Sequence, residues 1–84
     1  MVIQDECFED LQFWVSSNAK TAARILKLMG EVMRTPFKGT GKPERLKHWK
    51  ENAWSRRITE ADRLVYVVRD DRIDFLQARY HYGD

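Results

Sequence analysis

The sequence predicts an α+β fold, with two N-terminal helices packed on an antiparallel sheet of four or five strands. Three observations predict it. In the first part of the chain, apolar residues recur at three- and four-residue steps, which is the period of a helix. A loop rich in proline and glycine follows at residues 36–43. Beyond this loop, β-branched and aromatic residues occur in short stretches typical of strands.

Chain length and composition indicate one small folded domain. The chain has 84 residues, of which 43% are hydrophobic and 12% aromatic, too many for a disordered segment. A domain of this size without a disulfide or metal is stable by only about 3 to 5 kcal/mol. Dimerisation or a tightly bound partner would therefore help it.

The first 18 residues predict an edge strand and a helix. Val2–Ile3 fits a short edge strand. Residues 5–15 follow as a helix, with Phe8, Leu11 and Val15 on one face. Residues 16–18 (Ser-Ser-Asn) end this pattern and offer capping side chains for a second helix.

The second predicted helix spans residues 20–34. Its apolar positions are Ala22, Ile25, Leu26, Met29, Val32 and Met33. Thr35–Pro36 ends the helix, because a residue that precedes proline disfavours helical backbone. The two helices should form an antiparallel pair.

Four strands are expected downstream, where the apolar period changes. Their approximate ranges are 44–48, 53–59, 63–69 and 72–80. Asp70–Asp71 is a tight-turn signal between the last two, which predicts an antiparallel hairpin there.

The middle of the chain is its electropositive part, and the cysteine content and N-terminal sequence indicate a cytoplasmic protein. The net charge is only +2, but residues 38–63 carry eight basic side chains against four acidic ones. Cys7 is the only cysteine, so neither an intramolecular disulfide nor a Cys-rich metal site is expected. The acidic start lacks the pattern of a signal peptide, and no run of about 18 apolar residues predicts a membrane span.

Residues in the basic region and near the C-terminus suggest RNA cleavage without a metal. RNA carries its own nucleophile, the 2′-hydroxyl, so a protein needs a base, an acid and cations for the phosphate. Glu44 could be the base, or a carboxylate paired with neighbouring lysines on a solvated face. His81 could be the acid, because its ordinary pKa suits proton transfer near neutral pH, or a surface group near the end of the chain.

The arginines Arg56, Arg57 and Arg63 lie in or beside two neighbouring predicted strands. Side chains alternate between the faces of a strand, so Arg56 and Arg57 should point in opposite directions and only one should share a face with Arg63. A phosphate clamp and salt bridges to Glu60 or Asp62 are equally plausible for them.

The remaining candidates carry weaker signals. Trp14 and Trp54 are expected in the core, whereas Trp49 could be core or surface. His48 adjoins a predicted turn. Residues 39–42 lack the spacing of a phosphate-binding P-loop. Two scattered histidines provide no plausible ligand set, so neither a metal nor a cofactor is expected.

Five segments together resemble the YoeB (Txe/YoeB) family of the RelE/ParE superfamily of type II toxins, in the same order and at the same spacing. The segments are Arg34–Phe37, Gly39–His48, Trp54–Thr59, Arg63–Tyr66 and Ala78–Tyr82. The resemblance implies a microbial-RNase-like, RelE-type fold and ribosome-dependent cleavage of messenger RNA in the A site. It also implies neutralisation by a cognate YefM-type antitoxin.

The resemblance assigns a role to each site residue. Glu44 matches the base, His81 the acid and Arg63 the arginine that stabilises the phosphate. Arg57 and Lys47 match residues that add positive charge for substrate binding, and Tyr82 completes the catalytic site. A homodimer or a toxin–antitoxin hetero-oligomer is expected, with operator DNA bound only through the antitoxin.

Two other functions compete with this interpretation. One is an RNase that degrades free RNA, which the modest net charge disfavours because binding bare RNA draws on many phosphate contacts. The other is a non-catalytic RNA- or ribosome-binding module, which the presence of Glu44, Arg63 and His81 disfavours.

Overall fold

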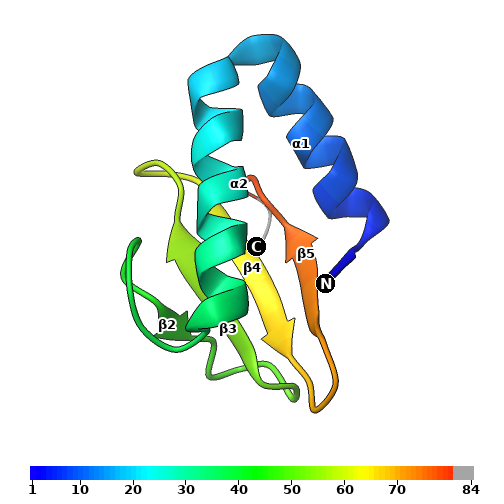
Figure 1. Ribbon diagram of the computed structural model, residues 1–84, viewed down its shortest axis with the longest axis vertical. Coiled ribbons are helices and arrows are strands. Elements are labelled where there is room, and N and C mark those ends of the chain that lie inside the picture. Colours follow the sequence, from blue (N-terminus) through cyan, green and yellow to red (C-terminus); the bar gives the residue numbers. More distant parts are fainter. Residues whose placement is uncertain (81–84) are drawn as a thin grey trace.

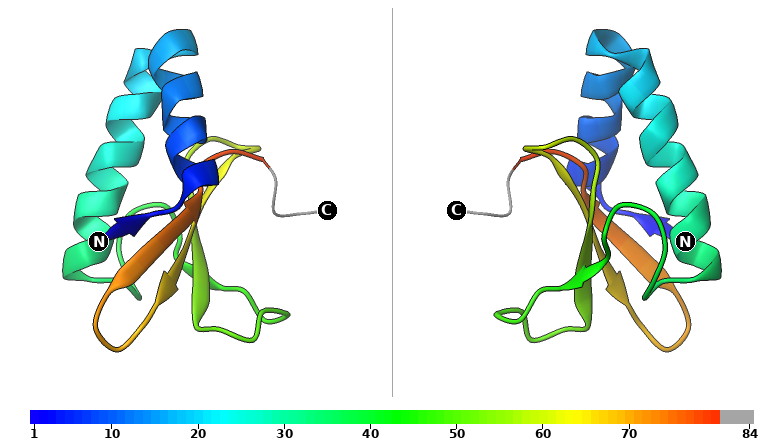
Figure 2. Two further views of the ribbon diagram at one scale, coloured as in Figure 1. Left: turned by 90° about the vertical axis from the view of Figure 1, so that its right-hand side faces the viewer. Right: turned by 90° about the vertical axis from the view of Figure 1, so that its left-hand side faces the viewer.

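The computed structural model describes residues 1–80. Two antiparallel helices, α1 (Asp5–Ser17) and α2 (Ala19–Arg34), pack on one face of a five-stranded sheet (Figures 1 and 2). The strands are β1 (Val2–Ile3), β2 (Glu44–Arg45), β3 (Ala53–Arg57), β4 (Arg63–Val68) and β5 (Ile73–Gln77). The predicted α+β fold is confirmed, although every strand after the loop is shorter than predicted.

The sheet is mixed, whereas the sequence predicted an antiparallel one. Its strand order is β1-β5-β4-β3-β2, and β1 pairs with β5 in parallel while the other neighbours are antiparallel. Parallel neighbours need a long connection between them, and here nearly the whole chain separates β1 from β5. Turn signals predict pairing between consecutive strands only, so they could not predict the pairing of β1 with β5.

Helix α2 presents most of the predicted apolar positions to the sheet. Ala22, Ile25, Met29 and Val32 are buried, and Asn18 caps the helix by accepting a hydrogen bond from the Thr21 amide at 3.2 Å. Leu28 is the fifth buried position. Leu26 and Met33, predicted for this face, are instead exposed.

Helix α1 is rotated from the predicted orientation. Phe8 and Val15 are 55% and 64% exposed, so the predicted apolar face is wrong at these two positions. Cys7 and Asp10 are buried instead, and Leu11 and Trp14 pack partly buried against the core. The orientation places the Asp10 carboxylate and the Trp14 indole where both reach the backbone of Ala78.

The core between helices and sheet is built mainly from α2, β4 and β5. Tyr66 and Phe75 are its largest fully buried apolar side chains. Trp54, like Trp14, is only partly buried at the edge of this core, where its ring lies 5.1 Å from that of Phe37. Within residues 1–80, no helix is long and apolar enough to cross a membrane.

Candidate active site

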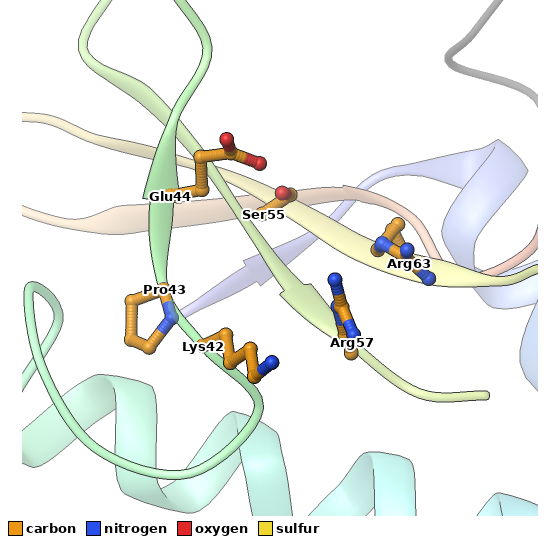
Figure 3. Close-up of a pocket in the computed structure, with 6 residues that line it drawn as sticks. All are labelled: Lys42, Pro43, Glu44, Ser55, Arg57 and Arg63. Carbon is orange, nitrogen blue, oxygen red and sulfur yellow. The ribbon is translucent and has the colours of Figure 1, made fainter. Parts of the chain in front are cut away.

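An open pocket of about 300 Å³ lies where β2, β3 and β4 meet (Figure 3). It is lined by Lys42, Pro43, Glu44, Ser55, Arg57 and Arg63. The fold thus brings together three of the predicted site residues, Glu44, Arg57 and Arg63, from three strands. Arg56 faces α2, so by strand alternation Ser55 and Arg57 point to the opposite face of the sheet.

Strand register fixes the spacing within the pocket. Glu44 on β2 is the direct partner of Ser55 on β3, and Arg57 on β3 is the direct partner of Arg63 on β4. Cross-strand partners share a face, so the carboxylate and both guanidinium groups stand on one surface. Sequence reasoning missed Ser55, although strand alternation counted back from Arg57 would have placed it on this face.

The pocket carries an excess of positive charge. Lys42, Arg57 and Arg63 face one carboxylate, and no ion pair within residues 1–80 engages any of these three cations. Like charges directly opposite each other across two strands are unfavourable. The arrangement is therefore suited to an anion such as a phosphate, which would relieve the repulsion.

Arg63 is held in place by main-chain oxygens. Its Nη1 donates hydrogen bonds to the carbonyls of Thr59, Glu60 and Asp62 at 2.9, 3.0 and 3.0 Å. Carbonyl oxygens orient the guanidinium but leave its full charge uncompensated. The salt bridges considered for Arg63 with Glu60 or Asp62 are absent from the described part of the chain.

Arg56 has a structural place on the opposite side of β3. Its side chain is fully buried, and Nη1 pairs with Glu31 Oε1 of α2 at 2.7 Å. Its other hydrogen bonds go to the carbonyls of Thr35, Lys38 and Thr40 and to the Tyr66 hydroxyl. Of these two adjacent arginines, Arg57 therefore lines the pocket, whereas Arg56 binds the main chain of the loop at residues 35–43.

Two titrating groups reflect these contacts. The Thr40 amide and then Arg56 hydrogen-bond the Glu31 carboxylate and lower its pKa. Burial raises the pKa of Tyr66, whose hydroxyl donates to the Pro36 carbonyl at 2.6 Å. Glu31 therefore stays ionised and Tyr66 stays protonated, which preserves the hydrogen bonds that hold the loop.

The loop reaches β3 through a glycine. Gly41 has φ of +86°, a region that side-chain-bearing residues rarely adopt, and its carbonyl accepts a hydrogen bond from the Arg57 amide at 2.7 Å. A Cβ at this position would lie 3.1 Å from the Arg57 carbonyl oxygen. This close approach sets where Lys42, Pro43 and Glu44 enter the pocket.

The segment that follows β5 is held by hydrogen bonds to α1 and to the β3–β4 loop. Asp10 accepts a hydrogen bond from the Ala78 amide and Trp14 donates one to the Ala78 carbonyl, both at 2.8 Å. The Tyr80 amide donates to Asp62 Oδ1 at 2.9 Å. His81 and Tyr82, both predicted site residues, lie outside the described residues.

Lys47 does not line the pocket. It is an exposed residue in the turn that follows β2, beside the equally exposed His48. Residues 1–80 contain no cluster of three or more His, Cys, Asp or Glu side chains that could hold a metal ion.

The amino-acid sequence is similar to those of known bacterial toxins. Residues 3–82 match the family model of the YoeB-like toxin of bacterial type II toxin–antitoxin systems. The chain is 49% identical over 77 residues to "Toxin RelK" of Mycobacterium tuberculosis, covering 92% of this chain and 91% of that protein. It is 43% identical over 82 residues to "Toxin YoeB" of Escherichia coli K12, covering 98% of both.

The fold is also similar to those of solved toxin structures. The YoeB/ParE toxin from Agrobacterium tumefaciens is 40% identical, with a TM-score of 0.89 and coverage of 96% of each chain. A YoeB dimer from Staphylococcus aureus is 34% identical with a TM-score of 0.86, and a YoeB–YefM complex from the same species is 35% identical with a TM-score of 0.84. Both cover 96% of this chain and 94% of theirs.

Proposed function

The chain belongs to the YoeB-like toxins of bacterial type II toxin–antitoxin systems, and from this membership we propose that it is an endoribonuclease. Its substrate is messenger RNA in the ribosomal A site, and cleavage there inhibits translation. The observation that carries the proposal is the pocket in which Glu44 stands beside Arg57 and Arg63, two arginines that no ion pair compensates within residues 1–80.

The chemistry follows from RNA itself and needs only proton transfer and charge stabilisation. Glu44 removes the proton of the 2′-hydroxyl, and the resulting 2′-oxygen attacks the adjacent phosphorus. The bond from phosphorus to the 5′-oxygen breaks, and the departing oxygen takes a proton from His81. The products are a 2′,3′-cyclic phosphate and a 5′-hydroxyl. Each positioned acid or base contributes about 10² to 10⁴ in rate.

Arg63 and Arg57 stabilise the charge that builds on the phosphoryl oxygens. Preorganised cations need no rearrangement during the reaction, and the three carbonyls around Nη1 hold Arg63 in this way. Lys42, which also lines the pocket, adds a third cation. Lys47, outside the pocket, would bind the substrate farther along the RNA. Tyr82 is proposed to complete the catalytic site with His81.

The partners follow from the family. The related toxin of Staphylococcus aureus was solved both as a dimer and in complex with YefM. We expect this chain likewise to form a homodimer or a hetero-oligomer with a YefM-type antitoxin in the cytoplasm. Binding to operator DNA would then occur only through the antitoxin.

The test is an RNA cleavage assay with mapped product ends. Purified protein, free of antitoxin, is incubated with a defined messenger RNA in the presence and absence of programmed ribosomes, with EDTA in the ribosome-free arm. Wild type is compared with Glu44→Gln and His81→Ala. Glu51→Gln serves as the matched control, because Glu51 is exposed and does not line the pocket.

Cleavage only on ribosomes, with 2′,3′-cyclic or 3′-phosphate ends, supports the proposal if the cleavage rate of both site variants falls about tenfold or more below wild type. Cutting of free RNA would support the ribosome-independent RNase instead. No cutting in either arm by folded protein would leave a non-catalytic binding module.

A further inference from the structure

The segment that precedes His81 is fixed at three successive residues. Ala78 is held at both its amide and its carbonyl by Asp10 and Trp14 of α1. The Arg79 guanidinium lies 3.6 Å from the centre of the Phe13 ring, also on α1. The Tyr80 amide donates to Asp62, which lies in the loop between β3 and β4, next to Arg63.

Asp62 differs from the α1 contacts because it also belongs to the loop that holds Arg63. Its Oδ1 accepts from the Tyr80 amide at 2.9 Å and its Oδ2 accepts from the Thr59 hydroxyl at 2.7 Å. Its own carbonyl accepts from Arg63 Nη1 and from the Ile58 amide, both at 3.0 Å. One residue thus connects the phosphate-binding arginine to the end of the described chain.

The Asp62 carboxylate does not act by neutralising a cation. It forms no ion pair with Arg57 or Arg63 within residues 1–80, so their charge remains available for a phosphate. Both of its oxygens are occupied by neutral donors, a main-chain amide and a hydroxyl. Its contribution is therefore geometric.

We propose that Asp62 is a positioning residue: by binding the Tyr80 amide, it sets where the end of the described chain stands relative to Arg63. The proposal rests on the proposed function, in which His81 is the acid. Consecutive Cα atoms are about 3.8 Å apart, so fixing the Tyr80 amide restricts where the next residue can lie. A misplacement of about 1 Å in a reacting group can cost roughly 10² in rate.

Three variants separate geometry from charge. Asp62→Ala removes both acceptors. Asp62→Asn removes the charge but retains an oxygen that can accept from the Tyr80 amide. It gives up the bond from the Thr59 hydroxyl, whose oxygen already accepts from the Ala61 and Asp62 amides. Glu60→Gln is the charge-matched control, because its exposed side chain has no hydrogen bond or ion pair within residues 1–80.

Single-turnover cleavage on programmed ribosomes gives the maximal rate and the toxin concentration for half-saturation. We expect Asp62→Ala to lower the maximal rate about tenfold or more and to change half-saturation less than about threefold. Asp62→Asn and Glu60→Gln should stay within about threefold of wild type in both. In ¹⁵N spectra, amide hydrogen exchange of Tyr80 should accelerate in Asp62→Ala only. Thermal unfolding of each variant verifies that it is folded.

Each outcome decides between the two proposals. If wild type cleaves and His81→Ala does not, but folded Asp62→Ala keeps the wild-type rate, the positioning role is wrong and the proposed function stands. Equal losses in Asp62→Ala and Asp62→Asn would also overturn it, because the bond to the Tyr80 amide, which Asn can retain, would then not be the cause. If wild type does not cleave on ribosomes, the proposed function fails and this inference fails with it.

Discussion

Replacing Arg56 by lysine should destabilise the protein far more than the same change at the adjacent Arg57. Arg56 is fully buried and its guanidinium forms five hydrogen bonds, four of which reach Glu31 and the loop carbonyls of residues 35, 38 and 40. A lysine keeps the positive charge, but it presents a single ammonium group in place of a planar fork. Arg57 lies exposed on the opposite face.

The expected magnitude follows from the contacts that lysine cannot reproduce. An ammonium group at this position can satisfy about two of the five acceptors, so about three hydrogen bonds are lost. At about 1 kcal/mol each, the free energy of unfolding should fall by about 3 kcal/mol. For a domain of this size, that corresponds to a melting temperature lower by roughly 10 to 25 °C. Arg57→Lys should cost less than about 0.5 kcal/mol.

Urea denaturation at 15 °C, followed by tryptophan fluorescence, measures both variants against wild type. The loop that Arg56 holds carries Lys42 to Glu44 into the pocket, so Arg56→Lys should also lower cleavage at temperatures where it remains folded. Arg57→Lys should lower cleavage without loss of stability. The reasoning is refuted if the two variants unfold at the same urea concentration.

Three further predictions rest on separate parts of the structure. Gly41→Ala should lower the free energy of unfolding, measured by urea denaturation, by about 1 to 3 kcal/mol and should lower cleavage. The alanine would have to adopt a positive φ, and its Cβ would lie 3.1 Å from the Arg57 carbonyl oxygen. Wild-type stability in this variant would contradict the prediction. Hydrogen bonds from Arg72 and Arg69 lower the pKa of Asp74, so its stabilising effect is present above about pH 4 and is lost as the pH falls through its folded-state pKa. Urea midpoints should therefore decline less steeply below pH 4 in Asp74→Asn than in wild type, and equal slopes would count against the contribution. Burial is the main reason that the pKa of Cys7 is raised to about 12, and the charges of Asp10 and Glu6 add to it. A thiol reagent at pH 8 should therefore modify Cys7 only after unfolding. Rapid labelling of the folded protein would disprove this.

Much of the fold was predictable because its signals are local. The apolar period, the capping Asn18 and the stop at Thr35–Pro36 located both helices to within two residues of their ends. The Asp70–Asp71 turn identified the β4–β5 hairpin. The rotation of α1 escaped prediction, because Phe8 and Val15 are apolar and yet exposed, while the buried position goes to Asp10.

The sequence predicted which residues belong to the site better than it predicted how they are arranged. Glu44, Arg57 and Arg63 were identified from sequence, and the structure brings all three into one pocket. Ser55 escaped notice because a serine within a strand carries no signal of its own. Lys47 was expected to bind substrate, and its position outside the pocket leaves that role to be tested.

The amino-acid sequence was enough to predict the fold class, the family, the basic middle of the chain and the opposite orientations of Arg56 and Arg57. These depend on composition and on periodicity along the strand, which the chain carries locally. The family resemblance assigned Arg57 to the site, but the physical reason that Arg56 faces away from the pocket came from the tertiary structure, because Glu31, the partner of Arg56, lies 25 residues away on α2. The parallel pairing of β1 and the dual contacts of Asp62 were decided in the same way. Each depends on groups that come together only when distant segments pack.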